Sequence, residues 1–142
     1  ILQEKLIGQV RYSSKINNDK VSLWIAETDN PIVGRYPFDE TVIIDRVRLE
    51  KEKSSVTLLE RSNFSPIEDV IVLTKCLNYS VSPITSGSWL FGQMDLTEPL
   101  TDNYQSLEIK IKHLIDGKFS VNDIFTDGRM IGSIRFIVGQ EL

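Results

Sequence analysis

The chain has very little of the residue types that several kinds of site require. Its 142 residues include one cysteine, Cys76, and one histidine, His113. A single cysteine excludes an intramolecular disulfide and a cysteine-based metal cluster within one chain, and a single histidine excludes a zinc site built from several histidines. So few cysteines favour a reducing compartment, and we therefore predict a cytoplasmic or otherwise intracellular location.

Alanine and long apolar runs are also scarce. Ala26 is the only alanine, and because alanine is the best helix former, its near absence argues against an α-rich fold. An AT-rich genome, as in low-GC bacteria, protists and many viruses, produces the same depletion. No apolar stretch approaches the ~20 residues of a membrane span, and no signal peptide is visible, so contact with a membrane is expected to be peripheral at most.

The net charge of −4 and the pI of about 5.0 argue against a nucleic-acid-binding domain, which is typically basic. The chain also contains no glycine-rich phosphate loop, no dinucleotide-binding fingerprint and no metalloprotease helix, the short motifs that identify common enzyme classes. We therefore predict a protein that is not an enzyme and that needs no cofactor.

The clearest structural pattern lies between Leu107 and Val138. Asp116–Gly117 is predicted to supply the two positive-φ residues of a tight hairpin turn, and Asp127–Gly128 a second reversal. The segment is therefore predicted to be a β-meander, with Gly132 marking a bulge or a close backbone approach in its last strand. Apolar and polar residues alternate in the first strand, and its apolar parity comprises Leu107, Ile109, Ile111, His113 and Ile115.

The same alternation predicts six further strands, and two long polar loops, Thr28–Glu40 and Thr97–Ser106, interrupt them. We predict an all-β fold, an antiparallel β-sandwich of about eight or nine strands with a jelly-roll, C2 or Ig-like plan; a partly open barrel is the alternative. The length predicts a single domain over residues 1–142. The six further strands are predicted at Leu6–Ser13, Val21–Ala26, Thr41–Lys51, Val56–Leu59, Asp69–Val81 and Trp89–Met94.

The first long loop is the predicted contact with a partner. Prolines and a glycine break any strand there, yet the loop carries several apolar side chains, and loops of this length are often functional. Together with at least one unpaired edge strand, the loop suggests a protein–protein interaction or self-assembly module, with a homo-oligomer as one outcome and a structural or accessory protein of a virus as one example. The predicted partner-binding residues are Pro31, Ile32, Val33, Tyr36 and Phe38.

A calcium-dependent membrane- or ligand-binding domain is the alternative. Calcium binds six to eight oxygens from carboxylates and carbonyls on irregular backbone, and loops at one end of a sandwich can supply them. Calcium-dependent C2 domains are similar in plan and size, although this chain contains no matching strand–loop motif. The predicted Ca²⁺ ligands are Asp29, Asp39, Asp95 and Asp102, and the competing interpretation is that aspartates are simply good turn residues.

His113 is the remaining chemical possibility. It falls on the apolar parity of a predicted strand, where a lone histidine is more often a hydrogen-bonded structural residue than a catalyst. An enzyme in which His113 acts as base toward Cys76 or a serine is the least favoured hypothesis, because the chain has no nucleophile elbow.

Overall fold

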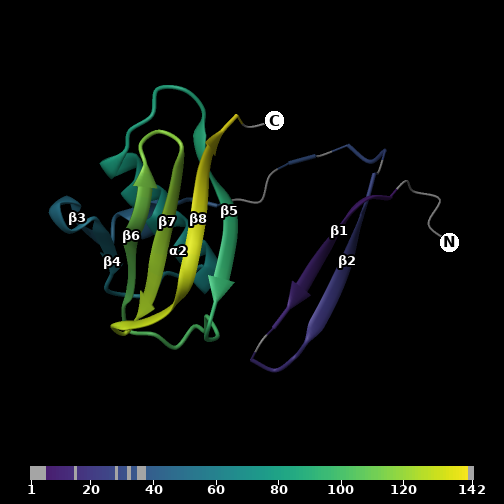
Figure 1. Ribbon diagram of the computed structural model, residues 1–142, viewed down its shortest axis with the longest axis horizontal. Coiled ribbons are helices and arrows are strands. Elements are labelled where there is room, and N and C mark those ends of the chain that lie inside the picture. The colour runs from purple at the N-terminus through teal and green to yellow at the C-terminus, as the bar shows by residue number, and fades with distance from the viewer. Residues whose placement is uncertain (1–5, 15, 28, 32, 35–37, 141–142) are drawn as a thin grey trace. The chain divides into compact units, whose positions relative to one another are not determined.

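The computed structural model describes residues 6–14, 16–27, 29–31, 33–34 and 38–140, and its ribbon is drawn in Figure 1. The chain divides into two compact units, Ile1–Phe38 and Asp39–Leu142. Within the described residues, the first unit holds a two-stranded sheet and the second a six-stranded sheet. The single domain predicted for residues 1–142 stays a prediction.

The first unit contains an antiparallel hairpin of β1 (Leu6–Ser13) and β2 (Lys20–Ala26). Its turn is held by short-range polar contacts: the Asn17 side-chain amide donates to the Asp19 carboxylate at 2.6 Å, and the Ser14 N–H donates to the Asp19 carbonyl oxygen at 2.8 Å. Asn18 has a φ of 59°, a conformation that asparagine adopts more easily than most residues. Both predicted strands are confirmed here.

The second unit is built on an antiparallel sheet with the strand order β3-β4-β6-β7-β8-β5. Figure 1 shows β6, β7, β8 and β5 side by side, so the predicted meander is confirmed, and β3 and β5 are the edge strands. A short 3₁₀ helix, η1 (Lys51–Lys53), joins β3 to β4. The strand bounds are β3 Val47–Glu50, β4 Ser55–Leu58, β5 Ser88–Leu96, β6 Leu107–Ile115, β7 Phe119–Thr126 and β8 Arg129–Gly139.

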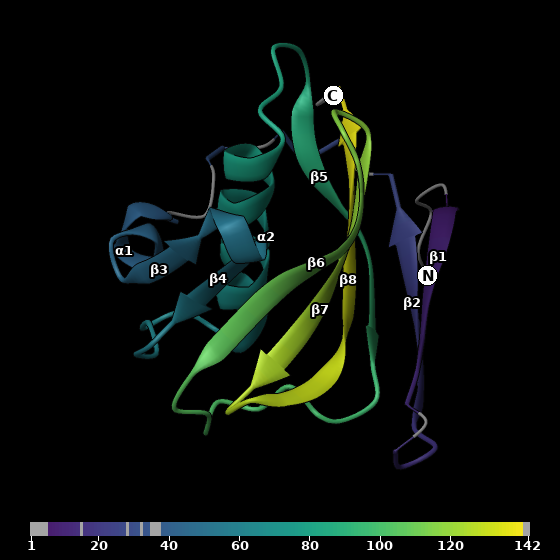
Figure 2. The ribbon, with the colours of Figure 1, turned by 60° about the vertical axis from the view of Figure 1, so that its left-hand side comes forward.

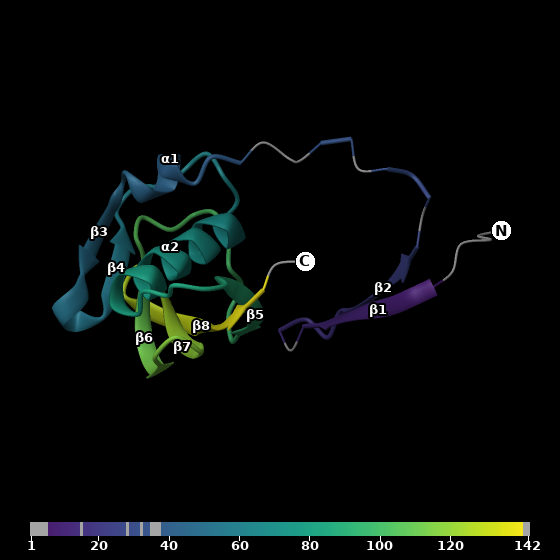
Figure 3. The ribbon, with the colours of Figure 1, turned by 90° about the horizontal axis from the view of Figure 1, so that it is seen from above.

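One helix, α2 (Pro66–Val81), covers one face of this sheet, as Figures 2 and 3 show. The apolar side chains between the helix and the sheet are fully buried and form the core, whose removal from water is the main stabilising contribution. The helix contributes Val70, Val72, Leu73 and Leu77, and the sheet contributes Val56, Leu58, Leu107, Ile109, Ile124, Ile134 and Phe136.

The prediction of a strand at Asp69–Val81 is wrong, because this segment is helical. The sequence Ser65-Pro66-Ile67-Glu68 starts the helix. The Ser65 N–H donates to Glu68 Oε2 at 2.7 Å, as in a capping box, and proline suits the first helical position. Buried residues then recur every three or four positions. The valines and isoleucines that suggested a strand are burial positions of a helix packed on a sheet, and packing outweighs their weak intrinsic preference.

Substitution of Ser65 tests whether this residue caps the start of α2. Ser65→Ala removes the hydroxyl that lies 2.8 Å from Glu68 Oε2 and is expected to lower the free energy of unfolding by about 1 kcal/mol. Urea unfolding followed by circular dichroism measures the loss. Ser80→Ala makes the same substitution inside the same helix and should change stability by less than about 0.5 kcal/mol. Equal effects of the two substitutions would mean that Ser65 does not cap the helix.

The predicted strand Thr41–Lys51 is only partly correct. Its first residues form a short helix, α1 (Thr41–Ile44), and only Val47–Glu50 pairs as β3. The Asp39 carboxylate accepts hydrogen bonds from the Thr41 N–H at 3.0 Å and from the Thr41 hydroxyl at 2.6 Å. This side-chain contact satisfies a free N–H at the start of a helical turn, and it therefore favours a helix over a strand.

A bulge in β6 changes the predicted faces of that strand. The pairing with β7 shifts between Ile111 and His113, so the residues after the bulge point to the face opposite to the one predicted. His113 and Ile115 are accordingly exposed, and the placement of His113 on the core face is wrong. The turn that follows also differs in detail, because only Gly117, and not Asp116, has a positive φ.

Gly132 lies where the backbones of β5 and β8 approach each other closely. A Cβ added there would lie 2.2 Å from the Asp95 carbonyl oxygen and 2.9 Å from Leu96 Cα. The predicted close approach at Gly132 is therefore confirmed. The predicted reversal at Asp127–Gly128 is confirmed as well, with both residues at positive φ.

The predicted fold class is confirmed: the described chain is mostly β, with eight strands in two antiparallel sheets, few helices, and no sheet closed into a barrel. No helix in the described part of the chain is long and apolar enough to cross a membrane.

Candidate interaction surface

The register of the hairpin separates its apolar from its polar side chains. Val10 pairs with Leu23, Tyr12 with Val21, and Gly8 with Ile25. Residues directly opposite in an antiparallel pair share a face, and residues two apart along a strand do so too. These six residues therefore lie on one face, which we call the apolar hairpin face.

Every described side chain of this face is far from buried. The exposed fractions are 48% for Val10, 60% for Tyr12, 46% for Val21, 60% for Leu23 and 44% for Ile25. These five neighbouring apolar side chains have no covering layer within the described part of the first unit. They form a continuous apolar surface.

The opposite face of the hairpin carries the charge. Arg11 pairs with Ser22, Ser13 with Lys20, and Gln9 with Trp24. The Arg11 guanidinium donates to the Gln9 side-chain oxygen at 3.1 Å. Trp24 is 65% exposed and is the large apolar exception on this face. The hairpin is therefore amphipathic, with an uncharged face and a basic, polar face.

The predicted contact loop is only partly described. Ile32 and Tyr36 lie outside the described residues. Pro31 is exposed and Phe38 half-buried, and Val33 is 97% exposed. The partner-binding role of the loop stays a prediction.

The four aspartates predicted as calcium ligands make separate local contacts or none that is described. Asp39 precedes α1, and the hydrogen bond from the Thr41 hydroxyl, followed by that from the Thr41 N–H, lowers the pKa of this carboxyl. Asp95 accepts from the Gln93 side-chain amide at 2.8 Å, and Asp102 lies 3.8 Å from the Arg61 guanidinium. Asp29 is exposed and belongs to the first unit.

The described residues contain no group of three or more His, Cys, Asp or Glu side chains that could hold a metal ion. His113 is exposed on the sheet, and Cys76 is half-buried on α2. Burial raises the pKa of the Cys76 thiol, which lowers its thiolate fraction and its reactivity.

A buried cluster at the start of α2 was not predicted. Asp69 is fully buried. Its carboxylate accepts hydrogen bonds from the Ser62 hydroxyl at 2.5 Å and from the Tyr104 hydroxyl at 2.6 Å. Burial, and then the contact with Asp69, raises the pKa of Tyr104, while the Arg61 guanidinium lies 5.8 Å from the centre of the Tyr104 ring. This cluster attaches the loop between β5 and β6 to the helix.

A second buried polar group lies between α2 and the sheet. The side-chain amides of Asn78 and Asn122 donate to the Ser120 hydroxyl oxygen at 2.8 and 2.9 Å, and all three residues are fully buried. The side-chain oxygens of Asn78 and Asn122 have no hydrogen-bond partner among the described residues. Apolar alternation in β7 favours Phe119, Val121 and Phe125 as the buried parity, whereas the structure buries Ser120, Asn122 and Ile124. No motif in the sequence indicates this polar grouping.

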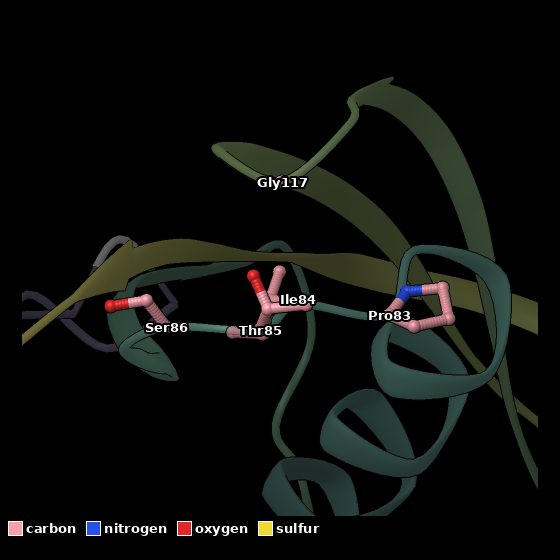
Figure 4. Close-up of a pocket in the computed structure, with 5 residues that line it drawn as sticks. All are labelled: Pro83, Ile84, Thr85, Ser86 and Gly117. Atoms are coloured by element: carbon pink, nitrogen blue, oxygen red, sulfur yellow. The ribbon is translucent and has the colours of Figure 1, made fainter.

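A shallow pocket of about 250 Å³ lies beside the turn between β6 and β7, and Figure 4 shows the residues that line it. The residue before Pro83 in the chain, Ser82, donates its hydroxyl to Asp116 and accepts the Gly117 N–H at 2.8 Å. No charged side chain lines the pocket, so its polar groups are hydroxyls and backbone. The lining residues are Pro83, Ile84, Thr85, Ser86 and Gly117.

Comparison of the chain with protein-family models, with curated proteins and with solved structures finds no match.

Proposed function

We propose that this protein is a non-enzymatic protein–protein interaction module that binds its partner through the apolar hairpin face. The observation that carries the proposal is the exposure of Val10, Tyr12, Val21, Leu23 and Ile25 on one side of a regular hairpin. A two-stranded hairpin is at best marginally stable in water without a covering layer. A partner that covers this face supplies that layer.

The chemistry of the face defines the partner. The face has no charged side chain, so covering it removes apolar area from water at no cost in charge desolvation. The only side-chain polar group on it is the Tyr12 hydroxyl, which can stay at the edge in contact with water. The fitting partner is therefore a protein surface that is itself apolar, uncharged and at least as long as the strands.

Site-specific photo-crosslinking inside the cells that naturally produce this protein tests the proposal. A photoreactive phenylalanine derivative replaces Leu23 on the apolar hairpin face, and in a matched control it replaces Trp24, the next residue of β2 on the opposite face. Both positions are exposed, at 60% and 65%. We expect covalent protein adducts at position 23 and about tenfold fewer at position 24, because the reagent reacts only with groups in direct contact. Equal adduct yields at the two positions, or none at either, would contradict the proposal.

A further inference from the structure

Resting on this proposed function, we infer that the partner is a second copy of this chain, bound hairpin over hairpin about a two-fold axis. Most homo-oligomers are symmetric, and a two-fold interface uses the same surface patch on both copies. A patch can pair with itself only if it carries no like charges that would face each other. The apolar hairpin face meets this condition, since Arg11 and Lys20 both lie on the other face.

One position on the face leaves room for a side chain of a second copy. Tyr12 and Leu23 are its most exposed side chains, at 60% each. Gly8 has no side chain, and a Cβ built there would have Ile25 Cδ1 as its nearest neighbour, at 4.0 Å. The face therefore has two projections and one depression. A two-fold axis across the strands at the Val10–Leu23 pair brings the turn end of one hairpin over the open end of the other. Each Tyr12 ring then lies over Gly8 of the other copy, and the two Leu23 side chains meet at the axis.

This arrangement is a small two-layer β-sandwich. Sheets that pack face to face lie about 10 Å apart with their strands aligned within about 30°, and apolar side chains from both layers fill the space between them. The polar faces of both hairpins, with Arg11 and Lys20, remain in water. Each hairpin then has the second layer that it lacks by itself.

The size of the interface sets the strength of the association. Five half-exposed side chains of this kind present roughly 400 Å², so two faces together bury roughly 800 Å². This is below the ~1,200 Å² at which standard interfaces begin. We therefore expect a dissociation constant of about 10–100 µM, and concentrated protein is needed to populate the dimer.

Light scattering coupled to size exclusion tests the inference on the full chain between about 1 µM and about 500 µM, a range that brackets this constant. The weight-average mass of the wild type should rise from one chain toward two. Leu23→Asp puts a charge into the interface and should weaken dimerisation on the order of 100-fold, so its weight-average mass should stay much closer to that of one chain than the mass of the wild type does. Trp24→Asp introduces the same charge on the opposite face and should dimerise like the wild type.

Several outcomes overturn the inference. The inference is wrong if the wild type stays monomeric at all concentrations. It is also wrong if the Leu23→Asp variant dimerises as well as the wild type. A monomer that cosediments with phosphatidylcholine vesicles, and loses this binding on Leu23→Asp, would assign the face to a lipid surface. If the purified chain is monomeric while crosslinking at position 23 yields adducts with other proteins, the second copy is wrong and the interaction function stands. If the purified chain is monomeric and crosslinking at position 23 yields no protein adducts, the dimer and the proposed interaction function are both wrong.

Discussion

Gly132→Ala is expected to lower the free energy of unfolding by about 3 kcal/mol or to prevent folding. The new methyl group would lie 2.2 Å from the Asp95 carbonyl oxygen and 2.9 Å from Leu96 Cα. Both atoms belong to the backbone of β5, which pairs with β8 at this point, so no side chain can rotate to make room. The strands must separate locally, and overpacking that moves backbone lies at the upper end of its usual 1–3 kcal/mol range.

Urea unfolding followed by circular dichroism measures this loss, and Gly92→Ala is the matched control. Gly92 lies in β5, which pairs with β8 as at Gly132. A Cβ added at Gly92 would lie 3.4 Å from the Arg135 carbonyl oxygen, which is an ordinary van der Waals distance. Because alanine restricts the unfolded chain, a compatible site gains about 0.4–1 kcal/mol. The two glycines should therefore respond with opposite signs. A Gly132→Ala variant as stable as the wild type would contradict the close approach of the two strands.

The strands could be predicted from the sequence where alternation and turn residues agree. In β6–β8 the apolar parity, the turn glycines and the single interior glycine, Gly132, all indicate one meander, and the structure has it. The prediction failed in α2, because its valines and isoleucines resemble a buried strand while the helix signals are confined to Ser65, Pro66 and Glu68. Short apolar runs do not distinguish a buried helix from a buried strand by periodicity alone.

Positions within a strand were predicted less well than the strand itself. One extra residue after Ile111 moves His113 from the predicted core face to the exposed face. A bulge follows from how two strands pair, and no residue near Ile111 signals it in the sequence. The role predicted for His113 as a buried structural residue depended on this parity and fails with it.

The sequence predicts which residues share the apolar hairpin face, but it does not predict their exposure. Alternation within the predicted strand Val21–Ala26 puts Val21, Leu23 and Ile25 on one side and Trp24 on the other, and the register of the hairpin confirms this division. The sequence could not indicate that these side chains stay uncovered, because alternation indicates which residues share a face and not what packs against it. The buried cluster around Asp69 was missed for a related reason, since its three hydrogen-bonded residues come from separate parts of the chain.

Removal of the Asp69 carboxylate is expected to destabilise the fold strongly. Asp69→Ala leaves the Ser62 and Tyr104 hydroxyls buried without their acceptor. Each orphaned group costs about 1–3 kcal/mol, so we expect a loss of about 3–5 kcal/mol in urea unfolding. Tyr104→Phe removes one donor only and should cost about 1–3 kcal/mol, because the Asp69 side chain stays buried without that partner.

A double-mutant cycle separates this cluster from general packing. If Asp69 and Tyr104 act through their mutual hydrogen bond, Asp69→Ala combined with Tyr104→Phe should cost at least about 1 kcal/mol less than the sum of the single losses. Losses that simply add would show that the two residues stabilise the protein independently. The cycle matters for the fold because Tyr104 lies in the loop before β6 and Asp69 in α2, so their bond joins the loop to the core.

The raised pKa of Tyr104 predicts how stability depends on pH. Burial, and next the hydrogen bond to Asp69, keeps its hydroxyl protonated in the folded chain above the ordinary value of 10.0. Below pH 10 both states hold the proton, and this group contributes no pH dependence. Above pH 10 the unfolded chain releases the proton first, so the free energy of unfolding should fall by about 1.4 kcal/mol per pH unit from this group. Urea midpoints taken at rising pH should therefore drop more steeply for the wild type than for Tyr104→Phe, which keeps the contributions of the lysines and the other tyrosines. Parallel slopes for the two proteins would mean that the Tyr104 hydroxyl titrates alike in the folded and unfolded chains, and the buried bond to Asp69 would then be wrong.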